Sequence, residues 1–166
     1  MYRVRVFRWE NGAGRRALVS WGRAFCVIEM LDHTADVGFE LGAPTLEGLF
    51  DEARRALLMV VFERPPQEGE EEGEILLSAP DRETLLVRWL NEVVYRIQDA
   101  GFVPVRAEIQ IHKTGGAGLS LRANLTGAPL LLEEYGWQGE IKSATFHGLE
   151  VSSDGEGWHA RVILDV

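Results

Sequence analysis

The chain has 166 residues, of which 46% are hydrophobic, enough for one ordinary domain with a single core. Its apolar stretches are far shorter than the roughly 20 residues of a bilayer-spanning helix, so neither a transmembrane segment nor a membrane partner is expected. Arginines interrupt the first residues, which argues against a signal peptide, and the single cysteine, Cys26, allows no internal disulfide. These features predict a cytoplasmic protein.

The formal net charge of −9 is unevenly distributed along the chain. Residues 1–24 contain six Arg and one Glu, a charge of +5, which leaves −14 for residues 25–166. An acidic surface repels phosphate backbones, so an extensive direct contact with nucleic acid is not expected for this main body. A basic protein partner or a metal ion is the better electrostatic match.

The basic segment at the start of the chain allows two interpretations. It carries a turn signal at residues 11–14 (NGAG) and two tryptophans, Trp9 and Trp21, and a basic aromatic arm of this kind could bind RNA. A poorly ordered tail is the favoured interpretation, because chain termini are often disordered. We therefore predict a basic N-terminal extension over residues 1–24 and a single domain over residues 25–166.

The first half of that domain begins with two strands and a helix. Residues 25–31 and 37–41 have strand-like patterns, and a polar cluster, DHTAD, occupies positions 32–36 between them. Thr45 is predicted to cap a helix with one apolar face, which ends before Pro65. The following acidic segment, residues 67–74 (QEGEEEGE), is expected to be a solvated loop.

A second helix follows a short strand at residues 75–78. Ser78, Pro80 and Asp81 mark the start of this helix, an apolar stripe that includes Trp89 runs along it, and Gly101 ends it. Trp89 is interpreted as a core residue.

Beyond residue 101 the apolar period changes from that of a helix to that of a strand. Residues 103–111 and 119–125 alternate across a glycine-rich turn and predict a hairpin. Further strands are predicted at residues 130–132, 141–147, 149–152 and 158–165. The expected fold is α+β, with two main helices packed on one face of a mostly antiparallel sheet.

The sequence lacks several common catalytic motifs. No P-loop occurs, because the glycines of residues 115–118 lie in a hairpin turn and do not precede a helix. One cysteine and four histidines show no paired spacing typical of zinc sites, and Cys26 lies in an apolar strand where an inert buried thiol is usual. The remaining candidates for a functional site are residues with oxygen ligands.

Carboxylates occur at the ends of predicted strands. Asp32 and Asp36 flank the polar turn, and Asp165 ends the last strand, beside the C-terminal residue Val166. If the two strand ends meet, Asp36 and Asp165 could bind Ca²⁺ or Mg²⁺, because hard cations neutralise clustered carboxylates. Ordinary turn and cap roles for these aspartates remain the alternative.

Lys142 and His147 are the other polar candidates. The alternation of their predicted strand places Lys142 on one face with Ala144 and Phe146. The lysine could be a counter-ion for the carboxylates, a contact to a phosphate, or a surface residue.

Five blocks of this sequence, in the same order, resemble the archease family. They are DHTADVG at residues 32–38, the helix start TLE at 45–47 with Phe50 and Ala53, LLVRWLNE at 85–92, EIKSATFH at 140–147, and the ending LDV at 164–166. Two features depart from the family pattern: Ser143 stands where alanine is usual, and residues 1–22 have no counterpart.

The resemblance implies an archease-like fold and an accessory protein with no ligase chemistry of its own. Its partner would be the tRNA-splicing RNA ligase, which joins 2',3'-cyclic-phosphate or 3'-phosphate ends to 5'-hydroxyl ends. The expected role is to promote guanylylation of the ligase histidine and to permit multiple turnover, with RNA contacted only through the ligase.

The resemblance also implies site residues. Asp36, Asp165 and an oxygen of Val166 would bind a divalent cation, with Ca²⁺ expected and Mg²⁺ or Mn²⁺ as alternatives. Lys142 would contact the ligase or its nucleotide, and Asp32, His33 and His147 are added as further contacts. An acidic tip holding a cation would suit a ligase pocket that binds metals and phosphates.

Two rival functions stay open. The first is a metal-dependent phosphoester hydrolase with Asp36 and Asp165 as ligands and His33 or His147 as general base. The second is a chaperone-like or RNA-binding adaptor that uses the basic N-terminal arm.

Overall fold

The computed structural model describes residues 7–9, 16–21, 24–30 and 36–166, with side chains from residue 37 onward. All strand pairs in it are antiparallel. The larger sheet has the order β1-β2-β3-β4-β9-β8, and its strands are β1 (Phe7–Trp9), β2 (Arg16–Trp21), β3 (Ala24–Met30), β4 (Asp36–Ala43), β9 (Trp158–Asp165) and β8 (Ser143–Ser153). The smaller sheet has the order β5-β7-β6, with β5 (Glu71–Ala79), β7 (Leu119–Pro129) and β6 (Phe102–Lys113).

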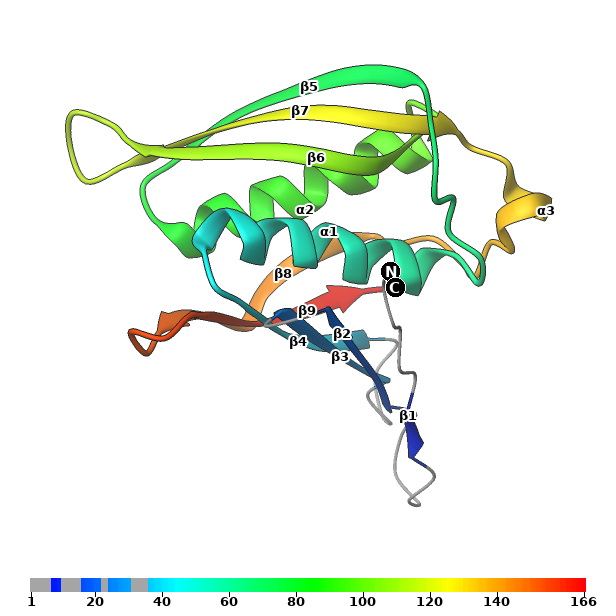
Figure 1. The fold of residues 1–166 in the computed structure, drawn as a ribbon, viewed down its shortest axis with the longest axis horizontal. Helices are drawn as coiled ribbons and strands as arrows, with labels where there is room; N and C mark the ends of the chain where they lie inside the picture. The colour runs from blue at the N-terminus through cyan, green and yellow to red at the C-terminus, as the bar shows by residue number, and fades with distance from the viewer. Residues whose placement is uncertain (1–6, 10–15, 22–23, 31–35) are drawn as a thin grey trace.

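Two long helices, α1 (Leu46–Val61) and α2 (Arg82–Gln98), lie between the two sheets (Figure 1). Helix α1 contacts β3, β4 and β9 of the larger sheet and β6 of the smaller one, and α2 contacts β8 on one side and β5, β6 and β7 on the other. The predicted α+β class with two main helices is confirmed. The strands form two sheets, however, so the helices are covered on both sides and not packed against one face of a single sheet.

Both helices begin at capping side chains. The Thr45 hydroxyl accepts a hydrogen bond from the Gly48 N–H at 3.0 Å at the start of α1, as the sequence predicts. At the start of α2 the Asp81 carboxylate accepts one from the Thr84 N–H at 2.7 Å, so the cap is Asp81 and not Ser78, which belongs to β5. Just beyond α2, Gly101 has a φ of 67°, the left-handed conformation that glycine adopts without strain.

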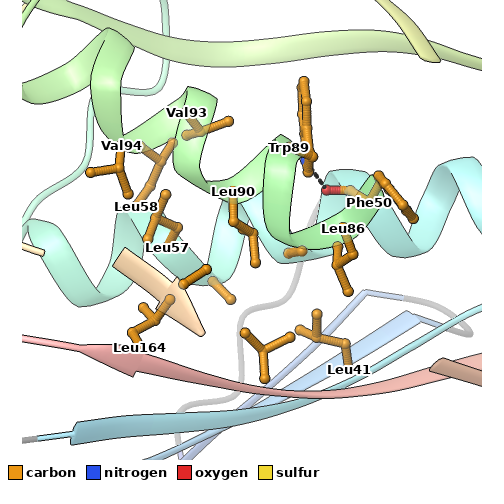
Figure 2. Packing of buried hydrophobic residues seen from close by; sticks show 14 of the residues in the cluster. Leu41, Phe50, Leu57, Leu58, Leu86, Trp89, Leu90, Val93, Val94 and Leu164 are labelled. Carbon is orange, nitrogen blue, oxygen red and sulfur yellow. Dashed lines mark hydrogen bonds between the residues drawn. The ribbon is translucent and has the colours of Figure 1, made fainter. Parts of the chain in front are cut away.

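The core fills the space between helices and sheets and is continuous from β4 to β9. Trp89 of α2 is fully buried, and its indole N–H donates to the Phe50 carbonyl of α1 at 2.8 Å (Figure 2). Leu41 of β4 and Leu164 of β9 extend from the larger sheet toward the same cluster. The interpretation of Trp89 as a core residue is confirmed.

Three element predictions need correction. Strand β5 begins at Glu71, inside the segment predicted as a loop. Among the described strands β5 pairs only with β7, and its exposed positions accept charged side chains. Residues 130–132 do not form a strand, since the short helix α3 (Leu132–Tyr135) starts there. The two strands predicted over residues 141–152 form the single bulged strand β8.

The N-terminal extension runs as strands where the structure describes it. Strand β1 pairs with β2, and β2 pairs with β3, so these segments extend the larger sheet at its β3 side. The division of the chain between residues 24 and 25 stays a prediction. No helix in the described part of the chain is long and apolar enough to cross a membrane.

Candidate functional site

The candidate site lies where β4 begins and β9 ends in the larger sheet. Asp36, the first residue of β4, is the direct register partner of Asp165, the last residue of β9, and Asp165 is also the partner of Ser143 on β8. Residues directly opposed on antiparallel strands have Cβ atoms about 4.5–5.5 Å apart on the same face of a sheet. The register therefore places the backbones of Asp36 and Asp165 opposite each other, which is the condition that a shared cation site requires.

Lys142 lies immediately before β8 and contacts the end of β9. Its ammonium Nζ lies 3.4 Å from Oδ1 of Asp165 and 3.1 Å from the main-chain oxygen of Val166, and its backbone N–H donates to the Asp165 carbonyl at 2.8 Å. The side chains of Lys142 and Asp165 are 67% and 43% exposed, so solvent screens this pair strongly. Of the three roles considered for Lys142, the counter-ion role matches these contacts.

Helix α2 fixes the chain on both sides of Lys142. The Gln98 side-chain amide accepts from the Ile141 N–H at 2.7 Å and donates to the Ile141 carbonyl at 2.9 Å. The Asn91 amide accepts from the Ala144 N–H at 2.7 Å, and its NH₂ lies 3.4 Å from the Ala144 carbonyl. Each amide thus satisfies backbone groups that would otherwise pair with a neighbouring strand. We call Asn91 and Gln98 together the α2 clamp, and they hold the segment that contains Lys142.

His147 is not part of this cluster. It is exposed in a large bulge of β8, four positions beyond Ser143, which is on the order of 13 Å along a regular strand. Lys142, Ala144 and Phe146 do not share one environment as the alternation predicted, because Ala144 is buried whereas Lys142, before β8, and Phe146, at the bulge, are exposed. Asp32 and His33 lie outside the described residues.

The donor set at the sheet end has the chemistry of a hard-cation site. Two carboxylates and a main-chain oxygen are ligands that Ca²⁺ and Mg²⁺ prefer, although Ca²⁺ takes six to eight oxygens and water would have to supply the remainder. Among the side chains that the structure describes, no group of three or more His, Cys, Asp or Glu residues could hold a metal ion. Asp165 and Val166 could form a cation site only together with Asp36. The Lys142 ammonium already contacts Asp165 and the Val166 oxygen.

Comparison with known proteins assigns the chain to a family. The model of the Archease protein family (MTH1598/TM1083) matches residues 28–166. This chain belongs to the archease family. The match contains β4, β8 and β9 and therefore every described residue of the candidate site.

Named archeases match over most of their own length. The protein archease of Methanosarcina mazei is 33% identical over 138 residues, which cover 83% of this chain and 94% of that protein. The protein archease of Pyrococcus abyssi is 30% identical over 139 residues, 83% of this chain and 97% of that protein. The solution structure of protein 1598 of Methanobacterium thermoautotrophicum matches with a TM-score of 0.65 at 30% identity, over 82% of this chain and 96% of that one. The predicted archease-like fold is confirmed.

Sequence reasoning missed the α2 clamp of this archease. Asn91 and Gln98 are seven residues apart, two helical turns, so they lie on one face of α2 beside its apolar stripe. Two amides at that spacing next to buried positions are a signal that could have been noticed. The segment that they bind is remote in sequence, and only the tertiary structure identifies it.

Proposed function

We propose that this archease is an accessory protein of the tRNA-splicing RNA ligase and has no catalytic activity of its own. In this proposal it promotes guanylylation of the ligase histidine and permits multiple turnover in the joining of 3'-phosphate or cyclic-phosphate ends to 5'-hydroxyl ends. Family membership supports the general assignment. A cytoplasmic location accompanies the proposal and rests on the single cysteine.

The observation that carries the proposal is the polar cluster at the end of the larger sheet. Asp165 is opposed to Asp36 on one side and contacts Lys142 on the other. The side chains of Lys142 and Asp165 are exposed, although an ion pair in water contributes only about 0–1 kcal/mol to stability. An exposed cluster that adds so little to the fold is well suited to contact a partner.

Within this cluster each residue has a proposed part. Asp36, Asp165 and the Val166 oxygen would hold the divalent cation, with Ca²⁺ preferred for its tolerance of irregular oxygen geometry. A cation held there would supply positive charge toward a nucleotide or a ligase group. The Lys142 ammonium would pair with the Asp165 carboxylate and the Val166 oxygen until a cation takes its place, and its side chain is long enough to turn toward a phosphate.

The charge of the domain supports a protein partner over RNA. Residues 25–166 carry −14, so RNA would be reached only through the ligase. In this proposal the ligase pocket, with its metal ions bound, is electropositive. An acidic tip would be attracted to such a pocket.

The test is the rate of ligase guanylylation with and without this chain. Wild-type protein is expected to accelerate guanylylation and to convert single-turnover joining into multiple turnover. Asp165→Ala, Asp36→Ala and Lys142→Ala are each expected to reduce the acceleration at least tenfold. The matched control is Glu156→Ala, which removes an exposed carboxylate at the other end of the β8–β9 pair.

Three results would contradict the proposal. Unchanged stimulation by Asp165→Ala and Asp36→Ala would show that the cluster is not the active element. Turnover of phosphoesters by the chain alone would support the hydrolase, with His33 or His147 as the base to test. Salt-sensitive RNA binding that is lost on deletion of residues 1–22 would support the adaptor.

A further inference from the structure

Strand β8 contains an unusually large bulge beside the candidate site. On β9 a single residue separates Ile163 from Arg161, whereas on β8 four residues separate their partners, Thr145 and Glu150. Three extra residues therefore leave the ladder at the edge of the larger sheet. Phe146 lies at the start of this bulge and is 61% exposed.

Local interactions hold the bulge in place. Gly148 has a φ of 62°, and a Cβ at this position would lie only 3.1 Å from Cδ1 of Ile163. On the side of the candidate site, the Thr145 hydroxyl donates to the Ile163 carbonyl at 3.2 Å, and the α2 clamp fixes Ala144. The backbone just before Phe146 is thus held by hydrogen bonds, and bulges are over-represented next to functional sites.

Phe146 lies on the same strand as the residue that pairs with the polar cluster. Ser143 is the register partner of Asp165, and Phe146 follows Ser143 by three residues, on the order of 10 Å along a strand. Aromatic side chains, Phe included, are enriched at the cores of protein interfaces. One surface can therefore contact the polar cluster and the ring together.

We propose that Phe146 is the apolar anchor by which this chain docks on its protein partner. The ring would enter an apolar pocket beside the active site that receives the Asp165 end of the sheet. This inference rests on the proposed function, because it takes the partner to be the RNA ligase. Base stacking of RNA on the ring is disfavoured by the acidic domain, and strand addition to β8 is disfavoured because a bulge interrupts edge pairing.

The experiment measures ligase guanylylation over a range of concentrations of this chain. Phe146→Ala is expected to raise the half-maximal concentration at least tenfold while the rate at saturation stays at the wild-type value. Asp165→Ala is expected to lower the rate at saturation. This difference separates docking through the ring from action through the carboxylate.

Three control variants accompany the measurement, each checked by thermal unfolding. Phe146→Tyr keeps the ring and is expected to restore the wild-type half-maximal concentration. Leu76→Ala removes a side chain that is 67% exposed on β5 of the smaller sheet, and it is expected to change nothing. Gly148→Ala disturbs the bulge without removing the ring, and it is expected to raise the half-maximal concentration.

The outcomes separate this inference from the proposed function. A normal half-maximal concentration for Phe146→Ala, with stimulation lost for Asp165→Ala, would overturn the docking role and leave the proposed function standing. Absence of stimulation by the wild type would overturn both. A Phe146-dependent affinity of the chain alone for RNA, or a Phe146-dependent dimer with normal ligase stimulation, would overturn the docking role and identify another occupant.

Discussion

Helix α1 buries two charged side chains in contrasting environments. Arg54 is only 2% exposed, and its guanidinium donates to the carbonyls of Pro104 and Val105 at 2.8 and 2.9 Å and pairs with Asp51. Glu52 is 4% exposed, and one of its oxygens pairs with Arg55 at 3.2 Å. Within the described structure the other oxygen, Oε2, has no hydrogen-bond partner. Burial raises the pKa of Glu52 from 4.5 to about 7, against the opposing charge of Arg55.

Glu52 is therefore expected to make the protein less stable as the pH rises. A carboxyl whose pKa is higher in the folded state contributes its full stability below about pH 4.5 and loses it as the pH rises through about 7. Glu52→Gln keeps the volume and abolishes the titration, so the free energy of unfolding of the wild type relative to the variant should fall by up to about 3 kcal/mol between these pH values. Urea denaturation at several pH values across this range measures the free energy of unfolding. Glu156→Gln is the exposed control, and parallel wild-type and Glu52→Gln profiles would contradict the argument.

Lys142 and a bound cation would compete for the same oxygens. Its ammonium contacts Asp165 and the oxygen of Val166, and an exposed pair of this kind contributes about 0.2–1 kcal/mol. Lys142→Met keeps the length of the side chain without the charge, so Ca²⁺ affinity measured by calorimetry is expected to rise by up to about fivefold. Asp165→Ala should abolish binding. Weaker binding by Lys142→Met would mean that the lysine assembles the ligands instead.

The candidate site was only partly predictable from single residues. The strand-end position of Asp165 followed from its place at the end of the last predicted strand. Its proximity to Asp36 depends on pairing between β4 and β9, which are remote in sequence. Local patterns carry no information on such pairing. The three roles left open for Lys142 could be narrowed only once the end of β9 was placed beside it.

Strand β8 depends on α2 for the position of its first residues. The Asn91 amide satisfies the half-buried N–H and carbonyl of Ala144. In Asn91→Ala these groups lose their partner, which typically costs about 1–3 kcal/mol, so both the unfolding free energy and the stimulation of the ligase are expected to fall. Urea denaturation measures the first effect. Asn124→Ala, at an exposed position on β7, is the control, and an Asn91→Ala protein with wild-type stability and stimulation would exclude a positioning role.

Elements were predictable where one periodicity persists over many residues. Both long helices and the β6–β7 hairpin were predicted, because their apolar residues recur at a constant spacing. The start of β5 was missed because edge-strand charges resemble a loop, and α3 was missed because its four residues are too few for a helical period. The bulge in β8 has one local signal, Gly148, which sequence reasoning did not use.

Because the strands form two sheets, each helix is buried on two opposite sides. The sequence predicted one apolar face for α1, whereas β3 and β4 cover one side of it and β6 covers another. Arg54 lies on the β6 side, where its donors reach the carbonyls at the bulge of that strand. An arginine is not counted as an apolar residue in a sequence pattern, even where it is buried. The second covered side of α1 was therefore not predicted.

The acidic charge of the domain should control how fast it meets its proposed partner, the ligase. Residues 25–166 carry −14, and raising the salt concentration from about 0.1 M to about 1 M shortens the Debye length from about 10 Å to about 3 Å. If charge steers the domain into an electropositive pocket, the association rate constant is expected to fall at least about tenfold over this range. Surface plasmon resonance with immobilised ligase measures it.

Phe146→Ala provides the internal comparison for this salt dependence. Its ring is uncharged, so the variant should show the same decline in association rate with salt while it dissociates faster than the wild type at every salt concentration. A wild-type association rate that does not respond to salt would exclude electrostatic steering by the acidic surface. Faster dissociation of Phe146→Ala would still support the anchor in that case, because the two contributions act on different rate constants.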